Sequence, residues 1–241
     1  MDMNTLNVSA TVNIFRLLAR PTLCLPHATV STFRHLPIPL NQAFGKYKDV
    51  DIRAVVLDKD NCFAYPKANE VYDDYKVRPK LSMLHELIII AITDIKHGIQ
   101  ESFKRLREAY PGRRLLIVSN TSGALSLDRS GKLADEVMKS TGVTVLPHST
   151  KKPGCGPEIM EYFLKYPETG VTRPDQIAVV GDRLTTDVMM ANLMGSYAIW
   201  VKDGVVPVEE TSVFARLEQK FAQFLIRRGY QAPDPASPFE K

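Results

Sequence analysis

The chain has 241 residues but only three cysteines, and it lacks any long apolar run. Cys24, Cys62 and Cys155 lie far apart and form no CxxC pair, which argues against a disulfide framework and a thiolate zinc site. We therefore expect a reducing compartment. The longest uninterrupted apolar stretch, Leu87–Ile92, is much shorter than the roughly 20 residues that a helix needs to cross a bilayer. The sequence thus predicts no transmembrane helix.

Acidic residues are absent between Asp2 and Asp49, although basic residues occur throughout this stretch. Apolar residues recur there at helical spacing with arginines beside them, and prolines end the pattern. The residues concerned are Val8, Val12, Phe15 and Ala19, then Arg16 and Arg20, then Pro21 and Pro26. We interpret residues 1–48 as a basic amphipathic segment that associates with a membrane. A mitochondrial transit peptide has the same composition, and the apolar face could equally pack on the protein's own sheet or on a second subunit.

From Ile52 onward, short apolar runs rich in β-formers alternate with helical patterns. The runs are Arg53–Leu57, Arg114–Val118, Val143–Leu146, Gln176–Val180 and Tyr197–Val201. The helical patterns are Leu81–Tyr110, Lys132–Ser140, Pro157–Lys165, Thr186–Met194 and Thr211–Arg228. This alternation predicts an α/β fold in which residues 49–230 form one domain around a doubly wound parallel sheet. Residues 231–241 are rich in proline, and we expect them to form a flexible tail.

Carboxylates follow two of the predicted strands at the point where each strand becomes a loop, which is where parallel sheets bind ligands. Asp58 and Asp60 follow the first run, and Asp182 follows the fourth. We predict that Asp58 attacks phosphorus, while Asp60 protonates the leaving oxygen and then deprotonates the hydrolytic water. Asp58, Asp182 and the Asp60 carbonyl offer oxygen ligands that suit Mg²⁺. An isolated Asp-x-Asp, however, is more often a polar turn.

Phosphate-binding groups are predicted after the second and third runs. Ser119 and Asn120 offer a hydroxyl and backbone amides that could bind phosphoryl oxygens. Lys152 precedes the N-terminus of a predicted helix, which itself favours anions, so we assign Lys152 to neutralising the phosphoryl charge and orienting Asp58. Each feature alone is ordinary loop chemistry, and only their order along the chain favours a functional interpretation.

Three neighbouring residues keep open roles. Asp187 either holds the loop around Asp182 or caps its own helix. Arg183 either reaches a substrate anion or forms a surface ion pair. Asn61 directly follows the carboxylate pair and tolerates the turn conformations that glycine allows.

The strand-end residues together resemble the four ordered motifs of the haloacid-dehalogenase superfamily. The matching segments are Asp58-x-Asp60, Ser119-Asn120, Lys152-Pro153 and Gly181-Asp182-x-x-x-Thr186-Asp187. The resemblance implies a magnesium-dependent phosphatase with a Rossmann-like sheet. Asn61-Cys62 departs from the Gly-Thr of many members without changing the carboxylates. Neither gap between motifs has room for a full cap domain, so we expect an open site that accepts a phosphate on a large substrate.

Three segments are similar to the mitochondrial phosphatidylglycerophosphate phosphatases of fungi: Leu57-Asp58-Lys59-Asp60-Asn61-Cys62, Leu25-Pro26-His27 and Lys151-Lys152-Pro153. This resemblance implies removal of the terminal phosphate of phosphatidylglycerophosphate to give phosphatidylglycerol, a cardiolipin precursor. It places the reaction on the matrix side of the mitochondrial inner membrane. The implied partner is a membrane phospholipid, with peripheral contact through the N-terminal segment and no nucleic acid. A homo-oligomer stays open.

Three other functions compete with this interpretation. The same chemistry could act on a phosphoprotein, because an open site accepts that substrate too. A non-catalytic membrane scaffold would be expected to have lost one of Asp58, Asp60 or Asp182, and all are present. A cysteine-dependent phosphatase needs an arginine six positions after its cysteine, and no cysteine of this chain has one.

Overall fold

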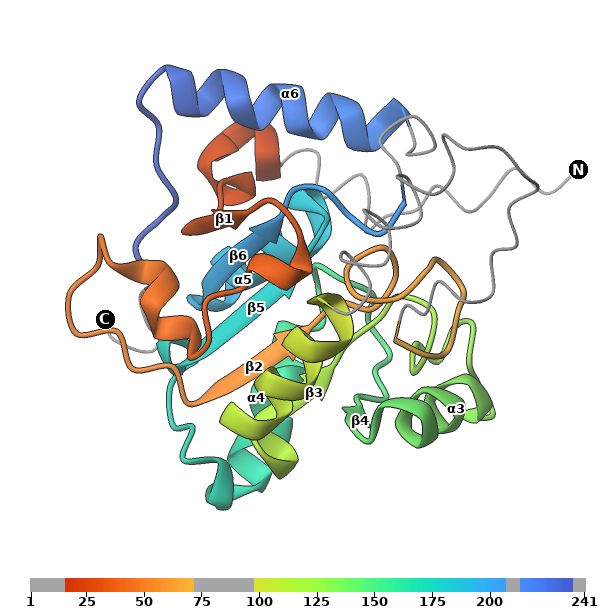
Figure 1. Cartoon of the computed structure of the whole chain (residues 1–241). Coiled ribbons are helices and arrows are strands. Elements are labelled where there is room, and N and C mark those ends of the chain that lie inside the picture. Colours follow the sequence, from red (N-terminus) through yellow and green to blue (C-terminus); the bar gives the residue numbers. More distant parts are fainter. Residues whose placement is uncertain (1–15, 72–97, 207–212, 236–241) are drawn as a thin grey trace, which may run out of the picture.

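The protein is described by a computed structural model that covers residues 16–71, 98–206 and 213–235. Its centre is a sheet of six parallel strands in the order β1-β6-β5-β2-β3-β4 (Figure 1). The strands are β1 (Ala28–Val30), β2 (Ala54–Leu57), β3 (Leu115–Ile117), β4 (Thr144–Val145), β5 (Ile177–Gly181) and β6 (Tyr197–Val201). The five strands that the sequence predicts are confirmed, and β1 is additional.

The predicted helices are also present where the structure describes them. They are residues 98–109, α3 (Lys132–Thr141), α4 (Gly156–Lys165), α5 (Met189–Met194) and α6 (Val213–Arg227), with a π-helical turn, η8 (Leu184–Val188), before α5. Glycines in the left-handed conformation follow α3 and α5, and a proline stands in the first turn of α4, as expected at helix ends. Residues 81–97 and 211–212 of the predicted helices lie outside the described residues.

Both faces of the sheet are covered, which explains why the strands read as continuous apolar runs. Along β2, Val55 and Leu57 face one core, while Ala54 and Val56 face the other. The first core also contains side chains of residues 98–109 and α3, and the second contains side chains of α4, α5 and α6. This is the doubly wound arrangement that we predict, and the described residues contain no large cap domain.

The topology brings the ends of three strands together. β2 lies between β3 and β5; the chain passes from β2 to β3 and β4 on one side and returns to β5 and β6 on the other. At such a switch point, the loops that follow the strands diverge and leave a crevice beyond their carboxyl ends. The loops after β2, β3 and β5 therefore meet at one edge of the sheet.

The N-terminal residues contribute to this domain, so residue 48 is not its boundary. Strand β1 pairs with β6, with Ala28 opposite Ile199, and Phe33, Leu40 and Phe44 are fully buried in the first core. Sequence patterns miss β1 because it has three residues and is only partly buried. Of the predicted amphipathic helix, residues 16–19 are helical, whereas Val8, Val12 and Phe15 lie outside the described residues.

No helix in the described ranges is both long and apolar enough to cross a membrane. The apolar stretch Leu87–Ile92 falls between those ranges.

His27 joins the N-terminal segment, the sheet and the C-terminal segment. Its Nδ1 accepts the Ala198 N–H at 2.9 Å, and its Nε2 donates to the Pro233 carbonyl at 2.9 Å. These partners require the neutral ring protonated at Nε2, and burial lowers the pKa of His27 below its usual value. Ala232 packs against the second core. Residues 231–235 of the expected flexible tail thus contact the domain, while residues 236–241 lie outside the described residues.

We expect His27→Ala to lower the free energy of unfolding by about 1–3 kcal/mol, because a buried N–H and a carbonyl lose their partner. Urea unfolding measures this loss, with the exposed His35→Ala as control. Because the unfolded state takes up the proton first, the stabilisation should decrease as pH falls below about 6.5. Equal stability of the two variants at pH 8 would contradict the role given to His27.

Candidate active site

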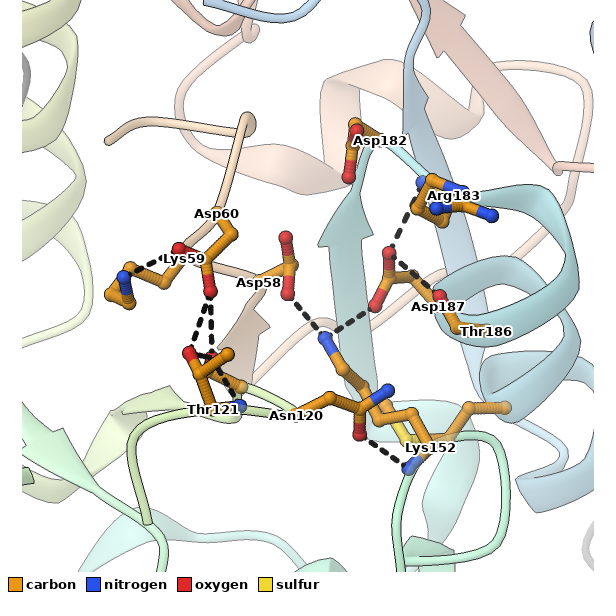
Figure 2. Close-up of polar contacts among 12 residues, drawn as sticks. Asp58, Lys59, Asp60, Asn120, Thr121, Lys152, Asp182, Arg183, Thr186 and Asp187 are labelled. Atoms are coloured by element: carbon orange, nitrogen blue, oxygen red, sulfur yellow. Dashed lines mark hydrogen bonds and ion pairs between the residues drawn. The ribbon is translucent and has the colours of Figure 1, made fainter. Parts of the chain in front are cut away.

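The structure brings the predicted site residues together at the carboxyl edge of the sheet. Asp58 follows β2, Ser119 follows β3, Asp182 follows β5, and Lys152 stands in the loop before α4. Figure 2 shows the side chains of Asp58, Lys152 and Asp182 converging on a common space between these loops. Asp58 and Asp182, which are 124 positions apart in the sequence, thereby share one electrostatic environment.

Lys152 is the centre of this cluster. Its ammonium group donates to Asp58 Oδ1 and, at 2.6 Å, to Asp187 Oδ1 (Figure 2). The Lys152 side chain is 3% exposed, and those of Asp58 and Asp187 are 9% and 2% exposed. Burial acts to lower the pKa of Lys152, but the two carboxylates outweigh it and hold the pKa above its usual value. Lys152 is therefore held as a cation in direct contact with Asp58.

Acidic groups outnumber this cation. Asp58, Asp182 and Asp187 each place a carboxylate oxygen within 4.8 Å of the others. Burial and the neighbouring carboxylates raise the pKa of Asp58 well above its usual value, and raise that of Asp182 to about 7. Asp182 Oδ1 is buried without a hydrogen-bond partner. Excess buried negative charge and an unsatisfied carboxylate oxygen fit a bound divalent cation, which oxygen ligands of this kind prefer.

Asp187 reaches Lys152 because the residue packed against its side chain, Gly181, has no side chain of its own. A Cβ on Gly181 would collide with the Asp187 side chain, so glycine is required at the end of β5. Asp187 Oδ2 also accepts the Arg183 N–H at 3.1 Å. Of the two roles left open by the sequence, Asp187 therefore holds the Asp182 loop and in addition fixes Lys152.

Asp60 lies in a separate group of contacts, which includes Lys59 and Thr121 (Figure 2). Its Oδ1 accepts from Lys59 Nζ at 2.6 Å and from the Lys67 N–H at 2.8 Å. Its Oδ2 accepts from Ser119 Oγ at 3.1 Å and Thr121 Oγ1 at 2.7 Å. Burial acts to raise the pKa of Asp60, but the contacts with Lys59, Lys67 and Thr121 outweigh it and lower the pKa. In this arrangement Asp60 is held as a carboxylate.

The two predicted phosphate-binding residues have different surroundings. Ser119 is fully buried, and its hydroxyl contacts Asp60 and Thr121. Asn120 Oδ1 accepts the Lys152 N–H at 2.8 Å, which joins the β3 loop to the lysine loop and leaves the Asn120 NH₂ group as a donor. Asn120 thus holds the backbone at Lys152.

Asn61 anchors Asp182. Its φ of 64° lies in the left-handed region, which asparagine tolerates. The Asn61 side chain donates to Asp182 Oδ2 at 2.8 Å and accepts the Val206 N–H at 2.8 Å. A Cβ on Gly204 would collide with Asn61, so this contact also needs a glycine. Asn61 therefore positions a carboxylate across the crevice.

Arg183 is held by α6. Its Nε and Nη2 donate to Glu218 at 3.2 and 3.0 Å, and Thr185 Oγ1 donates to the same carboxylate. The Glu218 side chain is only 6% exposed. Of the two predicted roles, the structure therefore shows an ion pair, with a buried partner rather than a surface one.

Sequence reasoning missed Lys59, Thr121 and Glu218. Lys59 is 1% exposed and also donates to the Ala68 carbonyl at 2.7 Å. The position of Lys59 between two apolar runs could have indicated that it is buried. A buried lysine requires an acidic partner, and Asp60 is adjacent. Nothing in the α6 pattern distinguishes Glu218 from an exposed acid before the helix is placed on the sheet.

The cysteines are unsuited to nucleophilic chemistry. All three are buried. Burial raises the thiol pKa of Cys24 to about 11 and of Cys155 to about 12, and it raises that of Cys62 well above the usual value. Neutral buried thiols are poor nucleophiles.

Comparison with known proteins identifies relatives over most of the chain. The model of the family described as Mitochondrial PGP phosphatase matches residues 8–206. The chain is 41% identical over 220 residues to Phosphatidylglycerophosphatase GEP4, mitochondrial, of Saccharomyces cerevisiae, covering 91% of this chain and 99% of that protein. It is 31% identical over 202 residues to the Probable phosphatidylglycerophosphatase, mitochondrial, of Schizosaccharomyces pombe, covering 83% and 84%. No solved structure matches the chain.

We expect Lys59→Met to raise the pKa of Asp60 and to cost about 3 kcal/mol of stability, because the partly buried Asp60 carboxylate loses its buried cation. A carbon-detected NMR titration of Asp60 and urea unfolding measure the two effects. Lys67→Met is the matched control, since Lys67 contacts Asp60 only through its backbone N–H. If both variants behave alike, Lys59 does not set the state of Asp60.

Proposed function

We propose, since the chain belongs to the mitochondrial PGP phosphatase family, that it removes the terminal phosphate of phosphatidylglycerophosphate to give phosphatidylglycerol. The observation that carries the proposal is the buried contact of Lys152 with Asp58 at the end of β2, beside Asp182. The names of the relatives in two fungi supply the substrate. The positions of these residues also agree with the roles that the resemblance to the haloacid-dehalogenase superfamily implies for them.

In the proposed mechanism, Asp58 is the nucleophile. Lys152 binds Oδ1, which leaves Oδ2 to attack phosphorus. The new bond joins Oδ2 to phosphorus while the bond to the glycerol oxygen breaks, and Asp60 in its protonated state donates a proton to that oxygen. Water then attacks the aspartyl phosphate, Asp60 accepts its proton, and phosphate and free Asp58 result. Asn120 and the backbone amides around it offer donors to the phosphoryl oxygens.

Asp60 has to leave part of its present contacts to take up this role. Its Oδ2 is held by Ser119 and Thr121, both hydroxyl donors that can rotate to a phosphoryl oxygen instead. Transfer of these hydroxyls to the substrate would free Oδ2 for the leaving oxygen. Ser119 then fulfils its predicted phosphate-binding role only when substrate is present.

The proposed cofactor is Mg²⁺, held by Asp58, Asp182 and the Asp60 backbone carbonyl. These are hard oxygen ligands, and the described residues offer no histidine or cysteine in this acidic cluster. The ion would offset the charge that otherwise repels a carboxylate nucleophile from phosphate. The unsatisfied Asp182 Oδ1 supports this assignment.

We further propose a place on the matrix side of the mitochondrial inner membrane, in the synthesis of cardiolipin, with peripheral contact through the N-terminal segment. The mitochondrial part follows from the relatives' names, and the basic N-terminal residues favour anionic lipid. A phosphoprotein phosphatase would use the same catalytic residues. A non-catalytic scaffold would not require Lys152 and Asp58 in buried contact.

Phosphate release should be strongest with phosphatidylglycerophosphate in vesicles, compared with a soluble phosphomonoester and a phosphopeptide. Asp58→Asn should abolish turnover while preserving the fold, because an amide is nearly isosteric but not nucleophilic, and Lys152 keeps Asp187 as a partner. Circular dichroism checks the fold. Faster turnover of the phosphopeptide would keep the chemistry and replace the substrate, whereas an active Asp58→Asn would remove Asp58 as nucleophile.

Magnesium should raise the melting temperature by roughly 5 °C or more at about 100-fold its Kd. Without a divalent cation, the raised pKa of Asp182 means that stability falls as pH rises from near 4 through about 7. Asp182→Asn should abolish the magnesium effect and flatten this pH dependence, and the exposed Glu108→Gln should do neither. Calorimetry with magnesium and with a chelator tests both; an unchanged magnesium response in Asp182→Asn would reject the site.

A further inference from the structure

Helix α6 carries a row of apolar side chains on its outer side. Val213, Phe214, Leu217, Phe221 and Phe224 are 65%, 58%, 57%, 43% and 50% exposed. Their spacing of three and four residues places them along one side of a helix with about 3.6 residues per turn. The adjoining side is already used, because Ala222 and Leu225 are buried in the second core. We call the five exposed residues the α6 apolar row.

The exposed surface of this helix is also positively charged. Arg216, Lys220, Arg227 and Arg228 are exposed, and Arg228 lies over the Phe224 ring with its guanidinium carbon 4.7 Å from the ring centre. The single acid of α6, Glu218, points inward to Arg183. The outer surface of α6 thus combines aromatic and aliphatic side chains with cations and no acid.

We propose that α6 docks on a bilayer containing anionic lipids, with the α6 apolar row entering the interface and the cations contacting headgroup phosphates. A helix lying in a membrane plane needs an apolar side flanked by Lys and Arg, and α6 has both. Anionic lipid complements the charge of the four cations. A second copy of this chain would bring the same cations against each other if it paired through the same face.

The docked helix is connected to the catalytic edge. Glu218 binds Arg183 and Thr185, which directly follow Asp182. In Figure 1, α6 begins on the side where the strands of the sheet end and runs back along the domain. A bilayer against α6 would therefore lie beside the crevice that receives the phosphate. This inference rests on the proposed function for its lipid substrate, but membrane binding itself can be measured without turnover.

The test is co-sedimentation of the full chain with phosphatidylcholine vesicles that contain or lack phosphatidylglycerol. We expect binding to the anionic vesicles, and a partition coefficient at least about tenfold lower for the Phe221→Ser, Phe224→Ser double variant. Ile226→Ser is the matched control, since Ile226 is 48% exposed on another side of the helix. Hydrolysis of a soluble phosphomonoester should stay at the wild-type level in both variants.

A second pair separates charge from apolar contact. Arg216→Gln with Lys220→Gln should weaken binding to anionic vesicles only, whereas Lys104→Gln with Arg105→Gln, exposed on residues 98–109, should not. Vesicle binding of the double phenylalanine variant equal to that of Ile226→Ser would overturn the proposal. The proposal would also be overturned if the double phenylalanine variant had a lower mass in light scattering but still bound vesicles. That result would assign the α6 apolar row to contact with a second copy of the chain. If the phenylalanine variant binds vesicles more weakly and the unmodified chain does not hydrolyse phosphatidylglycerophosphate, this inference stands and only the proposed function is rejected.

Discussion

The arrangement of the catalytic edge depends on a single ammonium group that is buried among three carboxylates. Lys152 neutralises part of this charge, so the loops must hold Asp58, Asp182 and Asp187 close to it at a cost that burial makes large. Each supporting contact answers that demand. Gly181 admits the Asp187 side chain, Asn61 binds Asp182, and Asn120 fixes the backbone of the lysine.

The nucleophile and the proton carrier occupy electrostatically opposite surroundings although they are two residues apart. Asp58 is buried near other acids, and burial together with these acids raises its pKa, whereas Asp60 is surrounded by donors, which lower its pKa. The two side chains are separated because β2 ends at Leu57. In the loop that follows, Asp58 and Asp60 do not point to the same side, as alternate residues of a strand would. Lys59, between them, points towards Asp60 and Ala68 and so belongs to the second environment. One short loop thereby supplies two carboxylates with different protonation behaviour.

Much of this arrangement could be predicted from local sequence. The five apolar runs are buried on both sides, and runs of that kind are distinctive. Polar residues that directly follow such runs, among them Asp58, Ser119 and Asp182, meet because parallel strands end at one edge. Contacts that depend on tertiary packing could not be predicted from the sequence. Strand β1 gains its identity only by pairing with β6, and Glu218 is buried only because α6 settles over η8.

The pairing of β1 with β6 also fixes the order in which the chain can fold. Ala28 and Ile199 are neighbours in the sheet but lie at opposite ends of the sequence, so the first strand has no partner until the last one exists. A ribosome delivers the N-terminal end first, and Phe44, whose ring packs on Tyr197, would lack that contact during most of synthesis. Such a chain suits a chaperone that shields its first apolar residues until synthesis is nearly complete.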